Sequence, residues 1–214
     1  MIHVSRGAEP SALAANWRAW TDAWVESKRG GPQLSEAWAA DRYGDPDVRS
    51  ALARDARGKC MYCEGRIKDV SYPHVEHYRP KGRYPELTFR WDNLGLSCSV
   101  CNVNKGDIFD KDAAPVDPYS ENPSDFLRPL GWYVQNHLGN ERGRVTVELM
   151  DLNRGDLLES RRAALLPLLK LLDVARSSSG SLREVALKEV RRAVAADAEF
   201  SFVCSQAARD LGGL

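Results

Sequence analysis

Two close pairs of cysteines restrict the fold of this chain more than any other feature of its sequence. Cys60 and Cys63 form one C-x2-C pair, Cys98 and Cys101 form another, and 34 residues separate the pairs. Each short spacing lets one turn present two thiolates, and four thiolates complete the tetrahedral shell that zinc prefers. Because such a shell has no open position for water or substrate, we expect a structural zinc site. Sites of this kind contribute on the order of 10 kcal/mol to folding, enough to organise the loop-rich stretch between the pairs.

The same cysteines allow a second interpretation, in which one pair is a thiol redox motif and the other is coincidental. Redox pairs normally occur singly near a βαβ pattern, whereas these two pairs bracket one segment. The N-terminus lacks the pattern of a signal peptide, and no stretch approaches the ~18 apolar residues of a membrane span. We therefore expect a cytoplasmic protein with reduced thiols and no membrane partner. Cys204 stands alone in a helical stretch and is expected to be a small buried apolar residue.

The charge of the whole chain identifies no partner. Its 30 lysines and arginines balance its 30 acidic residues, whereas a protein that slides along DNA needs a large surplus of basic residues. Any surface for nucleic acid must therefore be local. Between Arg57 and Lys105 the basic residues outnumber the acidic ones, which is a modest footprint for a phosphate backbone. A solvated charged face accounts equally well for any one of these residues.

Helical patterns precede the cysteine-bounded segment. Leucine and tryptophan recur at helical spacing and predict an amphipathic helix that ends before Gly30; these residues are Leu13, Trp17, Trp20 and Trp24. We expect the tryptophans to pack in a core, because aromatic stripes at this spacing usually face one. Asp45 and Pro46 have the residue types of an N-cap and a first helical position, and Gly58 is a stop signal. The second helix should therefore lead directly to Cys60.

These patterns divide the chain into four regions. The first is helical, the second is a module of short strands and loops, the third is a proline-dotted connector with a short strand, and the fourth is helical. Their bounds are 1–58, 59–112, 113–150 and 151–214. The short strand is predicted at 145–149, where apolar and polar residues alternate. The chain is therefore expected to have an α+β fold.

Two helices are expected in the last region. Leucines at helical spacing predict a helix across 157–172, and the serine-rich stretch 177–181 predicts a flexible break. Ser181 and Glu184 have the spacing of a capping box, which predicts that a further helix opens there.

Polar residues of every type that phosphodiester hydrolysis requires lie between and just after the cysteine pairs. His77 can take a proton from water near neutral pH. The Glu76 carboxylate and the Asn102 amide oxygen suit a hard divalent cation. Taken singly these residues mean little, because a lone histidine beside a glutamate is more often a hydrogen-bonded surface residue. Their order along the chain, together with Asn93, is what favours a functional site.

That order resembles the HNH endonuclease family. The matching motifs are Glu76-His77-x-x-Pro80, Asn93-Leu94 and Cys98-x-x-Cys101-Asn102-x-x-Lys105. The resemblance implies a ββα-metal (His-Me finger) nuclease module with a four-cysteine zinc knuckle, flanked by N- and C-terminal α-helices. In such a module His77 ends the first strand, Asn93 braces the following loop and Asn102 opens the helix.

The resemblance also implies a mechanism for cleaving DNA. His77 is then the general base, and Glu76 and Asn102 hold one catalytic cation. Asn102 stands where most of the family has histidine, and its amide oxygen favours Mg2+ or Mn2+ over a second Zn2+. The motif further places Arg79, Lys81 and Lys105 near the phosphate as nucleic-acid contacts.

His74 receives no role from the motif. Its interval of three residues from His77 places it on the opposite face of a strand. A loop or bulge that turned it inward would make it an additional metal ligand, and that alternative stays open.

A wider resemblance extends beyond the nuclease motifs. Cys60–Glu64, Glu76–Lys81, Val116–Tyr119 and Leu152–Arg154 resemble the HNH subunit of Septu-type anti-phage defence systems. This resemblance implies a defence effector that works with an ATPase partner. The flanking helices would then either form the docking surface for that partner or pack in the chain's own core. The competing interpretation is a zinc-knuckle module that binds nucleic acid or protein without catalysis. A decayed site of that kind would have lost His77 or the metal ligands, whereas all of them are present here.

Overall fold

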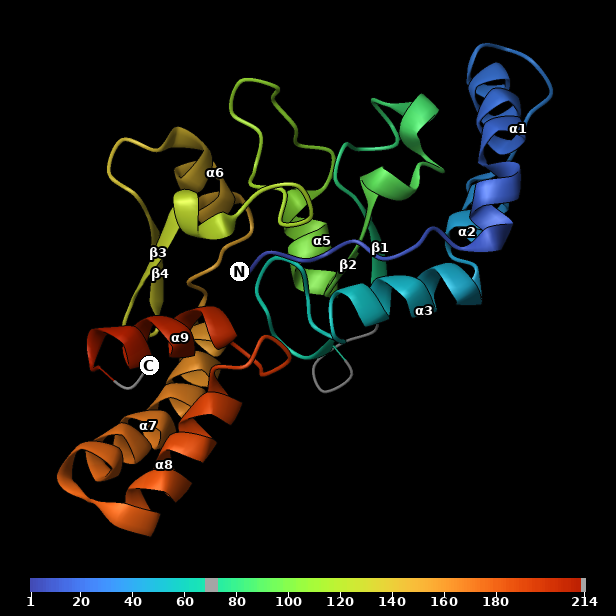
Figure 1. Cartoon of the computed structure of the whole chain (residues 1–214). Helices are drawn as coiled ribbons and strands as arrows, with labels where there is room; N and C mark the ends of the chain where they lie inside the picture. Colours follow the sequence, from blue (N-terminus) through green and yellow to red (C-terminus); the bar gives the residue numbers. More distant parts are fainter. Residues whose placement is uncertain (68–72, 213–214) are drawn as a thin grey trace.

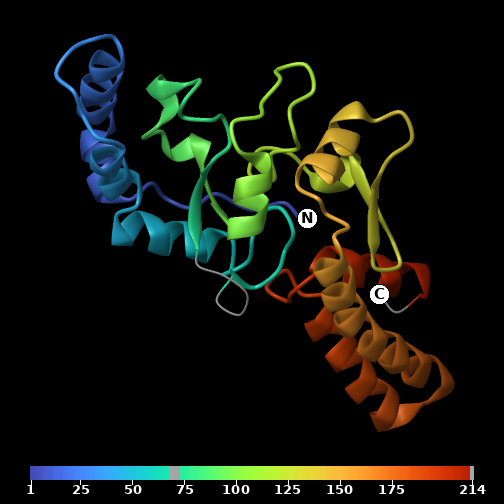
Figure 2. The same cartoon turned by 180° about the vertical axis from the view of Figure 1, so that it is seen from behind.

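Helices surround two small antiparallel sheets in the computed structural model, which describes residues 1–67 and 73–212. In chain order the elements are α1 (Ser11–Lys28), α2 (Glu36–Tyr43), α3 (Pro46–Asp55), β1 (His74–His77), η1 (Pro85–Leu87), η2 (Trp91–Asn93), β2 (Leu94–Ser97), α5 (Ser99–Lys105), η3 (Pro123–Asp125), β3 (Leu127–Leu130), β4 (Tyr133–Asn136), α6 (Glu141–Leu149), α7 (Gly155–Ser177), α8 (Gly180–Ala193) and α9 (Ser201–Asp210). Helices α1 to α3 lie at one end, α7 to α9 lie at the other, and β1, β2 and α5 lie between them (Figures 1 and 2). The predicted α+β fold with flanking helices is confirmed.

An aromatic cluster joins the N-terminal helices to the central module. Phe89, which has no exposed surface, packs edge-on against Trp20 of α1 and Trp38 of α2, with ring centroids 5.8 and 5.9 Å away. Trp24 stacks on Trp38 at 6.2 Å. Trp24 therefore lies in the core, and Trp17 and Trp20 are half-buried against it, which agrees with the predicted packing. Helix α2 was not predicted, although Ser35 accepts a hydrogen bond from the backbone N–H of Trp38 as an N-cap.

Helix α3 brings the chain to the first cysteine pair as predicted. Asp45 is the N-cap and accepts a hydrogen bond from the backbone N–H of Asp47, and Pro46 is the first helical residue. The chain then turns at Gly58, whose φ of 71° suits glycine. Lys68 and Asp69, two of the charged residues in the predicted basic segment, lie outside the described residues.

The central module has the ββα arrangement that the sequence predicts. Strands β1 and β2 pair antiparallel, with His77 opposite Leu94 and Glu76 opposite Gly95. Helix α5 follows β2 closely, and Cys98 is its N-cap, with a sulfur that accepts a hydrogen bond from the Cys101 N–H. His77 ends the first strand, and Asn102 lies in the first turn of the helix.

The strand predicted at 145–149 is wrong, because these residues belong to helix α6. Asn140 caps this helix by accepting a hydrogen bond from the backbone N–H of Gly143. Gly143, Thr146 and Met150 are buried, so the buried face repeats at helical spacing, and a five-residue alternation is too short to show this. The connector's strands lie earlier, in the β3–β4 hairpin.

The C-terminal helices follow the predicted leucine pattern but not the predicted capping box. Leu157, Leu165, Leu168 and Leu172 are buried along α7. Helix α8 begins at Gly180, before Ser181, and no side chain caps it. Ser181 therefore lies inside the helix, where its hydroxyl cannot act as an N-cap, and the turn into the helix is made at Gly180, whose φ of 59° suits glycine.

A buried ionic network ties the last helix to the turn beside the first cysteine pair. Lys59 donates hydrogen bonds to the carbonyl oxygens of Ala196 and Ala198, at 2.7 and 2.8 Å. Glu64 pairs with Lys59 at 3.3 Å and accepts a hydrogen bond from the Ser201 hydroxyl at 2.8 Å. The N-terminal ammonium of Met1 also pairs with Glu64, at 2.9 Å, so removing the buried Glu64 carboxylate would leave two buried cations without their counter-charge. None of the described helices has the length and apolar character that crossing a lipid bilayer requires.

Replacing Phe89 by alanine should destabilise the fold strongly. The substitution removes a fully buried ring that contacts two tryptophans, so we expect a loss of about 3–5 kcal/mol in the free energy of unfolding, measured by denaturant titration. Leu138→Ala is the control, since Leu138 is fully exposed and its truncation should change stability by less than about 0.5 kcal/mol. Equal effects of the two substitutions would contradict the proposed role of the aromatic cluster.

Candidate active site and four-cysteine cluster

The four cysteines form one buried cluster. Their sulfur atoms all lie within 4.8 Å of one another, and the Cys63 and Cys98 sulfurs are 3.9 Å apart. A tetrahedron with zinc–sulfur bonds of about 2.3 Å has edges of about 3.8 Å, so the cluster has the dimensions of a zinc site. A backbone hydrogen bond from the Met61 N–H to the Leu96 carbonyl holds the first pair against β2. The four cysteines are thus positioned to bind one zinc ion. This clustering disfavours the alternative in which one pair is a separate redox motif.

Two arginines from the C-terminal region approach this cluster. Arg154 lies with Nη1 3.9 Å from the Cys101 sulfur, and Arg161 is buried and donates a hydrogen bond to the Leu152 carbonyl at 2.6 Å. Burial lowers the pKa of Arg161 to about 10, and the Cys63 thiolate opposes this shift. Four thiolates around one Zn2+ leave a net charge of −2, which nearby guanidinium groups offset. The sequence motif at 152–154 indicated that this region resembles the related family, but it did not predict that Arg154 would approach the cysteine sulfurs.

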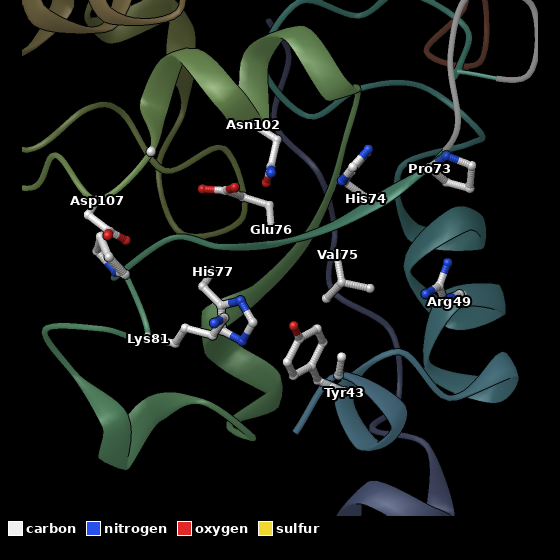
Figure 3. A pocket seen from close by; sticks show the side chains of 13 residues that line it. Tyr43, Arg49, Pro73, His74, Val75, Glu76, His77, Lys81, Asn102 and Asp107 are labelled. Atoms are coloured by element: carbon white, nitrogen blue, oxygen red, sulfur yellow. The ribbon is translucent and has the colours of Figure 1, made fainter. Parts of the chain in front are cut away.

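A cavity of about 470 Å³ lies beside β1, and the three residues predicted to do the chemistry line it (Figure 3). Glu76 and Asn102 lie between β1 and α5. The His77 ring lies on the other side of the strand, beside Lys81 and Tyr43. Adjacent residues of a strand point to opposite faces. The cavity therefore extends around the end of β1, with the carboxylate and amide on one side and the imidazole on the other.

The environment of His77 leaves one ring nitrogen able to accept a proton. Its Nε2 lies 3.0 Å from the Thr88 carbonyl oxygen, and because a carbonyl only accepts, Nε2 carries the proton and Nδ1 is left unprotonated. The Tyr43 ring packs edge-on at 4.7 Å between centroids. Burial lowers the pKa of His77 to about 4, against the opposing effect of the Thr88 carbonyl. The imidazole is thus neutral near pH 7.

Glu76 is held by two buried donors. The Lys105 ammonium lies 2.7 Å from Glu76 Oε1, and the Tyr62 hydroxyl donates to the same oxygen at 3.3 Å. Burial raises the pKa of the Glu76 carboxyl, while Lys105 and then Tyr62 oppose the rise. Lys105 also donates to the His77 carbonyl at 2.9 Å, so it links the ends of β1 and α5.

Asn93 closes the loop that follows β1. Its amide oxygen accepts a hydrogen bond from the Arg79 N–H at 2.8 Å, and its amide nitrogen donates to the carbonyl oxygens of Arg79 and Leu87 at 3.0 and 3.2 Å. All of these partners are backbone groups of the segment between β1 and β2. This geometry fits the bracing role that the family resemblance implies for Asn93.

The three basic residues predicted to contact DNA have different surroundings. Lys81 lines the cavity at its rim and pairs with the exposed Glu36 at 2.5 Å. Arg79 is exposed and lines a second hollow of about 770 Å³. Lys105 is only 1% exposed, and its ammonium is engaged by Glu76. Arg79 and Lys81 are therefore accessible to a phosphate, whereas the burial of Lys105 is at odds with the predicted contact.

Two further polar residues of the cavity come from the N-terminal helices, which also contribute Ala40. Tyr43 ends α2 and packs on His77, and Arg49 lies on α3 with its Nε donating to the Gly44 carbonyl at 2.7 Å. Neither belongs to a motif, so nothing in the sequence marked them. Of the other three histidines, His74 also lines the cavity, whereas His3 and His137 bond backbone carbonyls elsewhere; Cys204 is buried as predicted.

Comparisons with known proteins agree with this site. The family model described as HNH endonuclease matches residues 60–107. A Septu protein PtuB from Bacillus thuringiensis is 31% identical over 162 residues, which cover 74% of this chain and 57% of that protein. A Septu protein PtuB from Bacillus mycoides (strain KBAB4) is 27% identical over 136 residues, covering 49% of this chain and 46% of that protein. The chain thus spans about half the length of these curated relatives.

A third match is a Septu protein PtuA from the same Bacillus mycoides strain. It is 27% identical over 133 residues, which cover 49% of this chain but only 19% of that protein. The similarity is therefore confined to a small part of the longer protein.

Removing one cysteine of the cluster should release bound zinc and destabilise the central module. We expect one zinc ion per chain, measured by native mass spectrometry and elemental analysis, and none in Cys98→Ala. Because structural zinc contributes folding free energy, this variant should also lose most of its cooperative unfolding transition. The matched control is Cys204→Ala, whose cysteine lies outside the cluster and which should retain one zinc ion. Full zinc content in Cys98→Ala would contradict a four-cysteine site.

The His77 imidazole should titrate with a midpoint near pH 4 in zinc-loaded protein without other divalent cations, followed by NMR of the ring protons. In denaturant the midpoint should return to about 6.5. Because the pKa of His77 is lower in the folded state than in the unfolded state, protonation favours the unfolded state. The free energy of unfolding should therefore decrease as the pH falls from about 6.5 to about 4, and His77 should contribute no further decrease below about 4. A folded-state midpoint near 6.5 would show that the ring is not buried as described.

Proposed function

Since this chain carries an HNH endonuclease domain and is homologous to Septu protein PtuB, we propose that it is a metal-dependent endonuclease that hydrolyses phosphodiester bonds of DNA. The observation that carries the proposal is the state of His77. Its Nε2 proton is engaged by the Thr88 carbonyl, and its Nδ1 is neutral and basic in a cavity that Glu76 and Asn102 also line. A general base must be unprotonated at the working pH, and the burial of His77, which lowers its pKa to about 4, supports this condition.

In the proposed mechanism, His77 Nδ1 takes a proton from the water that attacks the phosphorus atom. A Mg2+ or Mn2+ ion bound by Glu76 and Asn102 would stabilise the negative charge on the phosphate and on the leaving 3′ oxygen. Hydrolysis with this leaving group yields products with a 5′ phosphate. The donor set fits such an ion, because it offers a carboxylate and an amide oxygen. Asn93 acts indirectly, by holding the loop after β1.

Three basic residues that are accessible to a ligand support a role in holding the DNA backbone. Lys81 and Arg49 line the cavity, and Arg79 lies at the second hollow. Such charges contribute affinity without reading the base sequence. The four cysteines would hold a structural Zn2+ that keeps β1 and α5 in place.

The similarity to PtuB proteins supports a wider proposal, that this nuclease is an effector of an anti-phage defence system and works with an ATPase partner. The division into regions 1–58, 59–112, 113–150 and 151–214, drawn from the sequence patterns, is also proposed, with the second region, which contains the family-model match at 60–107, as the nuclease. The flanking regions would then be available to the partner.

Plasmid cleavage tests the nuclease proposal. Supercoiled plasmid is incubated with zinc-loaded protein in Mg2+, Mn2+ or EDTA, and nicked and linear forms are separated on a gel. We expect cleavage that requires the cation and falls by about 10²- to 10⁴-fold in His77→Ala, the range for loss of a general base. Ligation of the products without prior kinase treatment would identify the 5′ phosphate.

A matched control is His137→Ala. The His137 Nε2 also bonds a backbone carbonyl, that of Ser124 at 2.9 Å, but His137 does not line the cavity. This variant should cleave at the wild-type rate. Undiminished cleavage by His77→Ala would contradict the role of His77, and nucleic-acid binding without any cleavage would favour the non-catalytic zinc-knuckle module.

The partner proposal requires a separate experiment. An ATPase encoded beside this chain should co-purify with it, and the pair should reduce phage plating by at least about tenfold relative to the pair with His77→Ala. Equal plating for the two pairs would contradict a nuclease-dependent defence role while leaving the plasmid result intact.

A further inference from the structure

We propose that His74 is a third protein ligand of the divalent cation that Glu76 and Asn102 would bind. The inference rests on the proposed function, because it concerns the same cation site. The His74 imidazole would add a nitrogen donor to the two oxygen donors of Glu76 and Asn102. This additional donor would change which cation the site prefers.

The direction of the side chains along β1 supports this assignment. His74 and Glu76 are two residues apart in the strand and are paired opposite Ser97 and Gly95 of β2. Residues two apart share one face of a strand, and residues three apart do not. His74 therefore lies on the same face of β1 as Glu76, and His77 lies on the opposite face. His74, Glu76 and Asn102 all lie on this side, between β1 and α5 (Figure 3).

The polar groups of His74 and Asn102 are unengaged within the part of the chain that the structure describes. Neither the His74 imidazole nor the Asn102 side-chain amide has a hydrogen bond or an ion pair with a described residue, and both line the 470 Å³ cavity. His74 is half-buried. An imidazole and an amide that enter one cavity beside a carboxylate are free to take a ligand there.

Glu76 has one oxygen left for the same purpose. Lys105 and Tyr62 both bond Oε1, and no described residue bonds Oε2. The two donors orient the carboxylate and favour its charged form, as hydrogen-bonded partners of metal-binding carboxylates do. The available donors are then one imidazole nitrogen, one carboxylate oxygen and one amide oxygen. Three protein ligands leave positions for water and for a phosphate oxygen.

The nitrogen donor has a chemical consequence. Mg2+ strongly prefers oxygen ligands, whereas Mn2+ and the later divalent metals accept imidazole readily. With His74 as a ligand, the site should bind Mn2+ more tightly than Mg2+. Without His74, two oxygen ligands remain and the difference between the two cations should shrink.

Direct cation binding tests the assignment without relying on cleavage. Mn2+ binding to zinc-loaded protein is measured by electron paramagnetic resonance of the free ion, and Mg2+ binding by competition. We expect His74→Ala to raise the Kd for Mn2+ by at least about tenfold and the Kd for Mg2+ by less than about threefold. His74→Asp replaces the nitrogen by oxygen and should restore cation binding with a preference shifted toward Mg2+.

Controls keep the outcomes distinct. Zinc content and thermal unfolding should match wild type in each variant, and His137→Ala should leave both Kd values unchanged. An unchanged Kd for Mn2+ in His74→Ala, with an increase in Asn102→Ala, would overturn the assignment while leaving the proposed nuclease standing. His74-dependent Mn2+ binding in a protein that never cleaves DNA would support the ligand and contradict the nuclease. Absence of any Mn2+ binding by the wild type would overturn the inference.

Discussion

The positions of β1, β2 and α5 depend on the clustering of four sulfur atoms from two distant points of the chain. Cys60 and Cys63 lie in a turn after α3, and Cys98 and Cys101 lie at the start of α5. Two four-residue strands have little stability of their own in water. Holding the turn against β2 and the helix start therefore determines where both strands lie. The cluster therefore also fixes the relative positions of the candidate site residues, Glu76 and His77 in β1 and Asn102 in α5.

The proposed general base depends on a second, apolar constraint. Thr88, whose carbonyl holds the His77 ring, directly precedes Phe89, the centre of the aromatic cluster with α1 and α2. Tyr43 of α2 covers the other side of the imidazole. The N-terminal helices thus do more than flank the module. They bury the base, fix the nitrogen that carries its proton and keep it neutral.

Charge compensation explains the positions of two cationic side chains, Lys105 and Arg154. Lys105 has the position of a phosphate contact in the sequence, but its ammonium offsets the buried charge of Glu76. Arg154 approaches the sulfurs of the four-cysteine cluster in a similar way. A buried charge is costly unless it is paired, so the nearest long cationic side chain is drawn inward. Exposed cations such as Arg79 keep their charge available for a ligand.

The sequence by itself determined the features that depend on local spacing. The paired cysteines and the cap at Asp45 follow from residues a few positions apart, and so they could be predicted. The order of Glu76, His77, Asn93 and Asn102 could be predicted because it matches a known motif. The strand expected at 145–149 failed because five residues show too little of a helical period. Only the tertiary structure decided the burial of Lys105 against Glu76 and the cover of His77 by Tyr43. These depend on contacts between segments far apart in the chain, whose distances no local pattern encodes.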